Sequence, residues 1–404
     1  MAEIDDVIVV GGGPTGFINA LGLAQAGLRV TVVEAEAQIS DSPRAAVYFW
    51  SVLDGLERLG ILEEAERIGF RKQDYTWLVR KTGERIEYTL EVLEGHTAHP
   101  YNLHLGQHYL AGIALRRLAD FPHAQVLFNT RLKALAQDAA GVTLSVEAPG
   151  GSTELRAKWV IGADGASSTV RHQLGLGFDG MTWPERFVAT NVFFNFESYG
   201  YARSTFLIDD QYGAVIAQID RSGLWRCTYM EDGALPEATC LERLPDAYRA
   251  ILPGADDYTV ERACPYRMHQ RSAPGYRVGR VVLAGDAAHA TNPTGGLGLT
   301  SALFDCYALY PALSAIILDG VGDAILERYS QERRAVFVNR ASPQASANKQ
   351  FIFHANGGGR KLEEALVAVR RFATDRDFLR ERLMFTKSLE TPAPLGDRSS
   401  GLAA

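Results

Sequence analysis

Short apolar runs and helical periods alternate along the first part of the chain. Ile4 to Val10 is a β-branched apolar run of the kind that forms a strand buried on both faces of a parallel sheet. A helical pattern covers Phe17 to Gly27, and a second apolar strand is predicted from Arg29 to Val33. The order strand, helix, strand predicts a parallel βαβ unit at the N-terminus.

Farther along the chain the pattern becomes antiparallel. Helices are predicted from Val47 to Leu59 and from Leu103 to Ala119, with a hairpin between them that turns at Thr82-Gly83. The hairpin strands and the later strands are predicted at Tyr75–Arg80, Arg85–Leu90, Gln125–Phe128, Val142–Glu147, Leu155–Gly162 and Arg280–Ala284, with four candidate strands between Arg186 and Met230. A glycine-rich loop and a long helical region follow the last of them.

These elements predict an α/β fold. We expect a Rossmann-like domain with a parallel sheet, interrupted by an antiparallel sheet domain that binds the substrate, and followed by C-terminal helices. The predicted division gives 1–70, 99–175 and 276–340 to the discontinuous nucleotide-binding domain, 71–98 and 176–275 to the sheet domain, and 341–404 to a C-terminal helical segment and tail.

Composition narrows the possible functions. The chain has 404 residues, 47% of them hydrophobic, and a formal net charge of -7, so it is globular and not suited to nucleic acid. The apolar stretch from Ala302 to Leu318 contains Asp305 and Pro311, which predicts a buried helix and no membrane span. Without a signal-peptide pattern we expect a cytoplasmic protein, and four cysteines without CxxC spacing predict reduced thiols.

A glycine fingerprint stands between the first strand and the first helix. In Gly11-Gly12-Gly13-Pro14-Thr15-Gly16, Gly11 makes the turn, Gly13 lets the backbone approach a pyrophosphate, and Gly16 lets helix and strand pack closely. Glu34 ends the second strand, where a carboxylate accepts hydrogen bonds from a ribose diol. The sequence therefore predicts an adenine dinucleotide site, the alternative being a simple glycine-rich turn.

Two further segments place an acid and glycines after a strand. One contains Asp164 and Gly165 in Val160-Ile161-Gly162-Ala163-Asp164-Gly165. The other contains Gly285 and Asp286, and then the loop Pro293-Thr294-Gly295-Gly296-Leu297-Gly298 before a helix. That helix N-terminus would aim free N–H groups at an anion. The alternative is that each acid only caps the following helix.

The three motifs in this order resemble the FAD-dependent aromatic hydroxylases, the single-component flavoprotein monooxygenases of the para-hydroxybenzoate hydroxylase type. The resemblance spans roughly residues 4 to 340. It implies tightly bound, non-covalent FAD and NADH or NADPH as a transient co-substrate. It also implies that O2 forms a flavin C4a-hydroperoxide, which hydroxylates a phenolic or hydroxypyridine ring, in some cases para to the hydroxyl with loss of a substituent.

The resemblance also assigns cofactor contacts residue by residue. Asp286 matches the acid that hydrogen-bonds the flavin ribitol, with Gly285 allowing close approach, and Asp164 and Gly165 match a second acidic motif near the pyrophosphate. Arg44 matches an arginine near the cofactor, and Gln107 matches a polar flavin contact. Pro43-Arg44-Ala45 and Tyr266-Arg267 look most like the compact para-nitrophenol and hydroxypyridine monooxygenases, and too few residues follow Arg340 for a further thioredoxin-like domain.

Candidate substrate and catalytic residues come from the strands and from the histidines. An arginine in the pocket would favour a carboxylate substrate, but the sequence does not show whether Arg203 or Arg226 points there. His104 and His108 have the i, i+4 spacing of a helical metal pair but lack a third ligand, so no metal is predicted, and a histidine or tyrosine is a candidate to deprotonate a phenol. The candidates are Pro293, His104, Tyr201, Arg203, Tyr212 and Gln218.

Two other classes remain open from the sequence. A flavin-dependent halogenase shares this kind of fold, but none of the five tryptophans stands in a Trp-x-Trp-x-x-Pro signature. A non-catalytic FAD-binding redox protein would use the fold for binding alone. The expected partners are an aromatic small molecule, O2 and NAD(P)H, with no nucleic acid and no membrane, and a homodimer is kept as a hypothesis.

Overall fold

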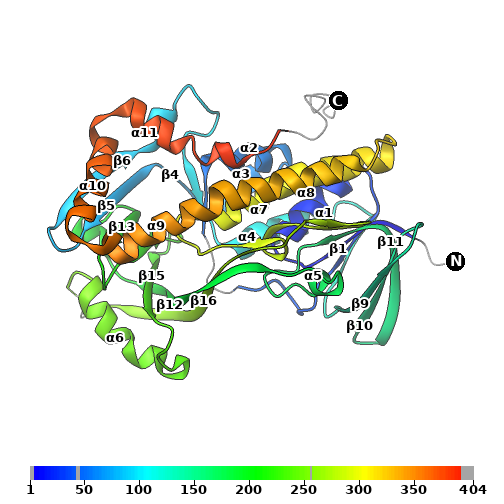
Figure 1. Cartoon of the computed structure of the whole chain (residues 1–404), viewed down its shortest axis with the longest axis horizontal. Helices are drawn as coiled ribbons and strands as arrows, with labels where there is room; N and C mark the ends of the chain where they lie inside the picture. Colours follow the sequence, from blue (N-terminus) through cyan, green and yellow to red (C-terminus); the bar gives the residue numbers. More distant parts are fainter. Residues whose placement is uncertain (1–3, 42–45, 255–256, 393–404) are drawn as a thin grey trace.

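The computed structural model of the chain describes residues 4–41, 46–254 and 257–392. In this part of the chain the strands form two sheets of eight strands and one of three strands. Figure 1 shows the two large sheets at opposite ends of the molecule, with α8 (Ala324–Val336) and α9 (Ser342–His354) running as a long helical rod from one to the other. A π-helical turn, Phe337–Ala341, joins the two helices of the rod.

The first sheet contains the predicted βαβ unit. β1 (Asp5–Val10) pairs in parallel with β2 (Val30–Val33) and β11 (Gly151–Gly162). The sheet continues through β8 (Ala124–Leu127), β18 (Val281–Leu283), β17 (Arg277–Val278) and the antiparallel pair β9 (Arg131–Gln137) and β10 (Val142–Ala148). The β1 side chains are almost fully buried, which is why their apolar run predicted the strand correctly.

The second sheet joins distant parts of the sequence. The predicted hairpin is confirmed as β5 (Asp74–Val79) and β6 (Glu84–Thr89), and β5 pairs in parallel with β13 (Ser204–Ile208). The remaining strands are β14 (Ala214–Gln218), β15 (Leu224–Asp232), β12 (Asp179–Phe193), β16 (Thr259–Ser272) and β19 (His289–Ala290). β16 was not predicted, because its sequence is rich in charged residues and lacks an alternating apolar pattern.

A three-stranded sheet corrects two predicted helix starts. β3 (Val47–Tyr48) pairs with β7 (Asn102–His104), which pairs with β4 (Phe70–Lys72). The helices predicted from Val47 and from Leu103 therefore begin later, as α2 (Trp50–Arg58) and α4 (Gln107–Leu118). Short strands buried on both faces have the same apolar run as a buried first helical turn, so periodicity alone did not separate them.

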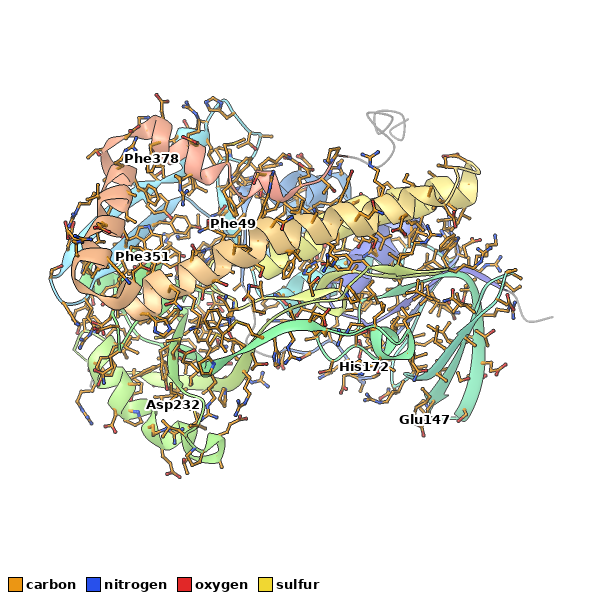
Figure 2. All side chains as sticks on the ribbon, in the orientation of Figure 1. Phe49, Glu147, His172, Asp232, Phe351 and Phe378 are labelled. Atoms are coloured by element: carbon orange, nitrogen blue, oxygen red, sulfur yellow. The ribbon has the colours of Figure 1, made fainter. Side chains whose placement is uncertain are left out.

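Helices cover both ends of the molecule. α1 (Pro14–Gln25) and α7 (Leu297–Leu318) pack together beside the first sheet, and α10 (Gly359–Thr374) and α11 (Arg376–Leu383) lie at the other end with β5 and β6 (Figure 1). The other helices are α3 (Leu62–Ile68), α5 (Thr169–Gln173) and α6 (Cys240–Ile251). Figure 2 places Phe351 and Phe378 at the end of the molecule that α10 and α11 cover, and Glu147 at the opposite end on the hairpin of β9 and β10. The architecture confirms the predicted α/β class.

Helix α7 is the segment of the described chain that has the length and apolar composition to cross a membrane. Its most apolar window is 61% buried inside the protein, and Asp305 within it is fully buried. This burial agrees with the prediction of a buried helix from Ala302 to Leu318. The four cysteines, Cys227, Cys240, Cys264 and Cys306, are free thiols, as predicted.

Candidate functional site

The glycine fingerprint forms a tight corner between β1 and α1. Gly11 has a φ of +113°, and a Cβ there would lie 2.3 Å from the carbonyl oxygen of Ala163. A Cβ on Gly16 would lie 1.8 Å from the carbonyl oxygen of Gly11, whereas Gly13 faces open space. Since no side chain caps the N-terminus of α1, its N–H groups are available to an anion over Gly13.

Glu34 lies beside this corner, as its position at the end of β2 predicts. One carboxylate oxygen accepts a hydrogen bond from the backbone N–H of Gly12 at 2.5 Å, and the other accepts from that of Glu36 at 2.8 Å. The carboxylate is thereby held at the edge of the glycine loop. A ribose next to the loop would meet it there.

The second acidic motif touches the first motif through Ala163. The Asp164 carboxylate accepts hydrogen bonds from the Ser168 hydroxyl and from the backbone N–H of Val170, at the N-terminus of α5. Burial raises the pKa of Asp164, and these hydrogen bonds oppose that effect. The Asp164 carboxylate therefore caps α5, as the alternative reading of the sequence expected. Gly165 beside it has a φ of +80° and faces open space.

The third motif completes the convergence. Gly285 has a φ of +59°, and a Cβ there would lie 2.7 Å from the Thr15 hydroxyl of the first motif. Arg171, on α5 after the second motif, donates a hydrogen bond to the carbonyl of Ala287 at 2.9 Å. Asp286 is exposed in a run of otherwise buried residues. The three motifs, far apart in sequence, thus surround one region at the carboxyl ends of β1, β11 and β18.

Asp305 of α7 fixes the backbone of the third motif, and sequence reasoning missed this role. One carboxylate oxygen accepts from the Gly285 backbone N–H at 3.0 Å and from His289 Nε2 at 2.7 Å, and the other accepts from Arg333 Nε at 2.8 Å. Burial alone would raise the pKa of Asp305, but His289 and Arg333 lower it below its ordinary value. The only signal in the sequence was an acid inside an apolar helix.

The N-terminus of α7 opens toward the same region. Gly295 and Gly296 have φ values of +88° and +66°, and Gly296 caps the helix without any side-chain hydrogen bond. Leu297 begins the helix, and Gly298 follows near Thr291. The first N–H groups of α7 can therefore receive the anionic edge of a flavin ring. The N–H donors of this helix and of the glycine loop, with the Glu34 carboxylate as acceptor, fit FAD.

A cavity of about 130 Å³, here called the inner cavity, lies between this loop and the second sheet. A cavity of about 150 Å³ is known to hold benzene, so the inner cavity has room for one substituted ring. The loop side is Ala46, Val47, Phe49, Pro293, Thr294, Gly295 and Gly296, and the sheet side is Tyr75, Phe187, Ala189, Ser204, Phe206, Val215, Ala217, Ile219, Arg226, Thr228 and Tyr266.

Arg226 is the charged residue of this lining. Its Nε and Nη2 donate to the side-chain oxygen of Asn191 at 3.2 and 2.9 Å, which orients the guanidinium. Burial lowers the pKa of Arg226 to about 10, so it still carries its charge at neutral pH. The sequence did not show whether Arg203 or Arg226 enters the pocket. The structure places Arg226 there, whereas Arg203 is exposed and forms an ion pair with Glu197 at 3.7 Å.

Of the six candidate catalytic residues, Pro293 lines the inner cavity and the others do not. Tyr201 is packed in a hydrophobic cluster with Phe196. Tyr212 accepts a hydrogen bond from Gln211 at 3.2 Å, and the Gln218 backbone N–H donates to the carbonyl of Arg203 at 2.9 Å. A substrate role for these residues stays a prediction.

His104 lies in β7 and His108 in α4, so the two histidines do not share one helix as their i, i+4 spacing allowed. Its Nδ1 lies 2.8 Å from the carbonyl oxygen of Gln218, and its buried Nε2 has no hydrogen-bond partner in the described chain. Burial lowers the pKa of His104 to about 3. So weak a base accepts few protons from a phenol, which disfavours the predicted catalytic role.

Two predicted flavin contacts remain to be placed. Gln107 is half-buried and begins α4 after Gly106, as predicted, and its contact with the cofactor stays a prediction. Arg44 lies outside the described residues.

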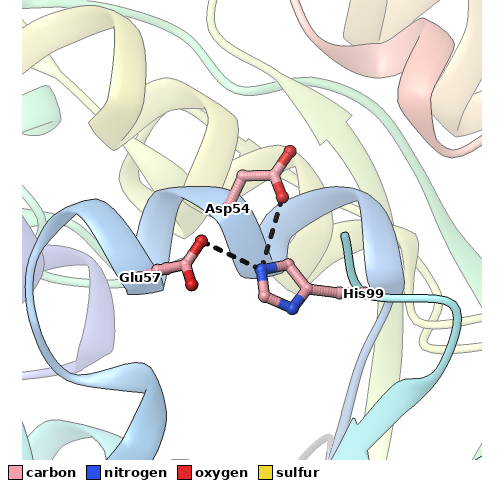
Figure 3. A group of neighbouring side chains, drawn as sticks. All are labelled: Asp54, Glu57 and His99. Atoms are coloured by element: carbon pink, nitrogen blue, oxygen red, sulfur yellow. Dashed lines mark hydrogen bonds and ion pairs between the residues drawn. The ribbon is translucent and has the colours of Figure 1, made fainter. Parts of the chain in front are cut away.

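Among the residues that the structure describes, one group of side chains could hold a metal ion, although the sequence predicted none. Figure 3 shows Asp54 and Glu57 of α2 directed at the same Nε2 atom of His99, at 3.5 and 3.2 Å. The other ring nitrogen of His99 lies 3.1 Å from the Tyr101 hydroxyl. Both ring nitrogens of His99 thus have hydrogen-bonding neighbours within the protein, which accounts for the arrangement without an ion.

A second cavity, here called the outer cavity, has a volume of about 160 Å³. It shares Phe49, Tyr75, Phe206 and Gly295 with the inner cavity. Most of its other walls come from β5, β6 and the C-terminal helices, and α2, β7 and α7 contribute one residue each. They comprise Trp50, Trp77, Tyr88, Leu90, Asn102, Leu297, Gln344, Asn348, Ile352, Phe372, Leu379, Arg382, Leu383, Phe385 and Thr386.

Comparison with known proteins agrees with this geometry. The FAD binding domain family matches residues 5–341. The 6-hydroxy-3-succinoylpyridine 3-monooxygenase HspB of Pseudomonas putida is 44% identical over 388 residues, which is 95% of this chain and 98% of the relative. Para-nitrophenol 4-monooxygenase of a Pseudomonas species is 42% identical over 393 residues, which is 96% of this chain and 97% of the relative.

Solved structures give the same result. The crystal structure of p-nitrophenol 4-monooxygenase PnpA from Pseudomonas putida has a TM-score of 0.92 at 40% identity and covers 98% of this chain and 100% of that chain. The ternary complex of aklavinone-11 hydroxylase with FAD and aklavinone has a TM-score of 0.78 at 27% identity and covers 88% of this chain and 70% of that chain.

The fold, the convergent glycine corners and these similarities define a flavoprotein monooxygenase. The chain belongs to the FAD-dependent aromatic hydroxylases that carry this FAD binding domain. Within them it falls with the para-nitrophenol and 6-hydroxy-3-succinoylpyridine monooxygenases. The predicted family and the FAD cofactor are confirmed, and the named relatives give no support to a halogenase or a non-catalytic protein.

Proposed function

We propose that the chain uses NADH or NADPH and O2 to hydroxylate a single-ring phenol or hydroxypyridine, at the ring carbon para to the hydroxyl and with displacement of a substituent there. The observation that carries this proposal is the inner cavity. Its volume of about 130 Å³ suits one ring, and it lies between the loop from Pro293 to Gly296 and the Arg226 guanidinium.

The residues that would hold FAD lie at the three converging corners. The glycine loop 11–16 and the N-terminus of α1 would bind the pyrophosphate, Glu34 the adenosine ribose, and Asp286 the ribitol. The N-terminus of α7 at Gly296 would face the polar edge of the flavin. When bound, FAD supplies the redox chemistry that links NAD(P)H, O2 and the ring.

The protein's own residues position the ring and control its charge. The Arg226 guanidinium would attract a phenolate or another anionic group and lower the pKa of a phenol close to it, because a positive charge favours the ionised form. The phenolate is the electron-rich form that aromatic hydroxylation needs. Phe187, Ala189 and Ile219 are buried apolar parts of the wall, which would exclude water from the reacting ring.

A panel of phenols and hydroxypyridines tests the proposal. It should include 4-nitrophenol and 6-hydroxy-3-succinoylpyridine, the compounds named in the two relatives. We expect one compound to stimulate NAD(P)H oxidation and to yield a ring product that carries one oxygen atom from labelled O2. If no member of the panel stimulates NAD(P)H oxidation, the proposal is wrong. It is also wrong if hydrogen peroxide is the only product, in which case the protein is an oxidase.

A further inference from the structure

The outer cavity is a second aromatic compartment that the hydroxylation reaction itself does not require. Its volume of about 160 Å³ again suits one ring. Eight of its nineteen lining residues are aromatic, among them Trp77, Tyr88 and Phe206 from the second sheet and Phe372 from α10. Such a lining favours a flat aromatic ligand by burial and by ring stacking.

The outer cavity carries a polar feature suited to a ligand. The buried indole N–H of Trp77 has the Tyr88 hydroxyl as its hydrogen-bonding neighbour, but at a geometry too poor for a full hydrogen bond. A buried donor with so poorly formed a hydrogen bond is costly. An oxygen atom of a hydroxyl or nitro group on a bound ring would satisfy it.

The two cavities are adjacent in a definite order. Phe49, Tyr75 and Phe206 line both, so these three rings separate one compartment from the other. Every residue that lines the inner cavity is buried or half-buried, whereas the outer cavity has Arg382, on α11, as an exposed lining residue. The outer cavity therefore reaches the protein surface at Arg382, while the inner cavity has no exposed lining residue among those that the structure describes.

Arg382 places a positive charge at the exposed edge of the outer cavity. Its guanidinium has no hydrogen bond or ion pair to the residues that the structure describes, whereas Arg380 on the same helix pairs with Asp377. The chain as a whole has a net charge of -7, which repels anions at long range. An uncompensated cation at the rim of an aromatic cavity attracts an aromatic anion locally.

We propose that the outer cavity is the access site, where a single-ring phenolate binds beside Arg382 before it passes Phe49, Tyr75 and Phe206 into the inner cavity. This inference rests on the proposed function for the identity of its ligand. The C-terminal segment α9 to α11 then acts as the wall of the access route, in addition to covering the sheet. Binding occurs in two steps, and the charge of Arg382 accelerates the first.

Rapid mixing of the FAD-loaded protein with 4-nitrophenol at a pH above its pKa tests the order of binding. Trp50 and Trp77 line the outer cavity, so quenching of tryptophan fluorescence reports its occupation, while a change in flavin absorbance reports arrival in the inner cavity. We expect the fluorescence change to precede the absorbance change, and its amplitude to fall in Trp77→Phe. A single shared rate for both signals overturns the inference, as does the absence of any signal.

Charge variants on α11 provide the matched comparison. Arg382→Gln is expected to slow the fluorescence phase about threefold to tenfold and to remove most of its dependence on ionic strength. Arg376→Gln, which removes the same charge from an exposed position outside the cavity, should leave the rate unchanged. Equal rates in the two variants overturn the inference.

The volume of the site gives a second, independent variant. Leu383→Trp should fill the outer cavity and raise KM for 4-nitrophenol while leaving kcat nearly unchanged, provided that flavin content and melting temperature match the wild type. If these do not match, Thr386→Phe replaces it. The binding measurements use neither NAD(P)H nor turnover, so they decide this inference even when the hydroxylation proposal fails on the product panel.

Discussion

The Asp305 carboxylate and the Arg333 guanidinium form a fully buried ion pair, with Oδ1 and Nε separated by 2.8 Å. Arg333 also donates to the carbonyls of Leu389 at 2.6 Å and Ser301 at 3.1 Å, so each of its three nitrogens has an acceptor. The other carboxylate oxygen of Asp305 holds the Gly285 backbone. The pair therefore links the helical rod to the strand end that carries the third cofactor motif.

Replacement of Asp305 tests this link. Asp305→Asn leaves the buried Arg333 without its counter-charge, so we expect the free energy of unfolding to fall by about 3–5 kcal/mol. We also expect weaker FAD binding, because Gly285 and His289 lose an anionic acceptor. Urea unfolding and titration of the apoprotein with FAD measure the two effects.

The matched control is an exposed pair on α6, Asp246 with Arg249 at 2.9 Å. Asp246→Asn should change neither quantity measurably, since surface ion pairs contribute little. Equal stability of Asp305→Asn and the wild type would show that the buried pair is not needed for the third motif.

The glycine corner gives a second prediction. A methyl group on Gly16 would lie 1.8 Å from the Gly11 carbonyl oxygen, so Gly16→Ala must push α1 away from the end of β1. We expect a colourless preparation that binds FAD at least about tenfold more weakly, because the loop and the helix N-terminus no longer share one geometry.

The control for this change is a glycine inside a helix with space around it. Gly112 in α4 has Arg116 as its nearest neighbour, 3.5 Å from an added Cβ, which is an ordinary contact. Gly112→Ala should therefore retain FAD fully and be slightly more stable. Retention of stoichiometric FAD by Gly16→Ala would contradict the assigned role of the corner.

The sequence predicted the strand ends and glycine turns of this corner because each of them is local. Fully buried parallel strands are uniformly apolar, and the glycines and acids at their ends stand within a few residues of them. The partners of Asp305 could not be predicted in the same way. Arg333 and Gly285 are remote in sequence, and only the packing of α7 against α8 and β18 brings them together.

Residues of the second sheet were harder to assign for a different reason. Alternation along a strand shows which side chains share a face but not which face meets the cofactor loop. Arg203 and Arg226 were therefore equivalent in the sequence, and the sheet order separated them. The strands at Val47 and Asn102 were missed because they are too short for any period to show.

Acid stability should depend on His104. Because burial lowers its pKa to about 3, the folded state disfavours a proton that the unfolded chain binds below about pH 6.5. The stabilisation is complete above that pH and is lost as the pH falls toward 3. From this group we expect a loss of about 2 kcal/mol in the free energy of unfolding between pH 7 and 5.

His104→Gln keeps a donor for the Gln218 carbonyl but cannot be protonated in this range. Its unfolding free energy, measured in urea at several pH values, should therefore fall less steeply than that of the wild type. Parallel curves for the two proteins would mean that His104 is not the group that titrates.

Arg226 gives the prediction that bears most directly on the substrate. Its guanidinium is oriented by Asn191 and lines the inner cavity, where a hydrogen bond to a charged group contributes about 1.5–3 kcal/mol. Arg226→Gln should therefore weaken binding of a phenolate or a carboxylate-bearing ring by about tenfold to a hundredfold. The same change should raise the pKa of the bound phenol and move the pH profile of kcat to higher pH.

Arg203 is the matched comparison, because it has the same charge and directly precedes β13 of the same sheet. Unlike Arg226, it is exposed and paired with Glu197. Arg203→Gln should leave both the dissociation constant and the pH profile unchanged. Affinity is measured from the flavin absorbance change on titration with 4-nitrophenol, with an uncharged phenol as a second ligand. A loss of affinity that is equal for the neutral and the anionic ligand would indicate a damaged cavity wall, and would contradict a role for the charge of Arg226.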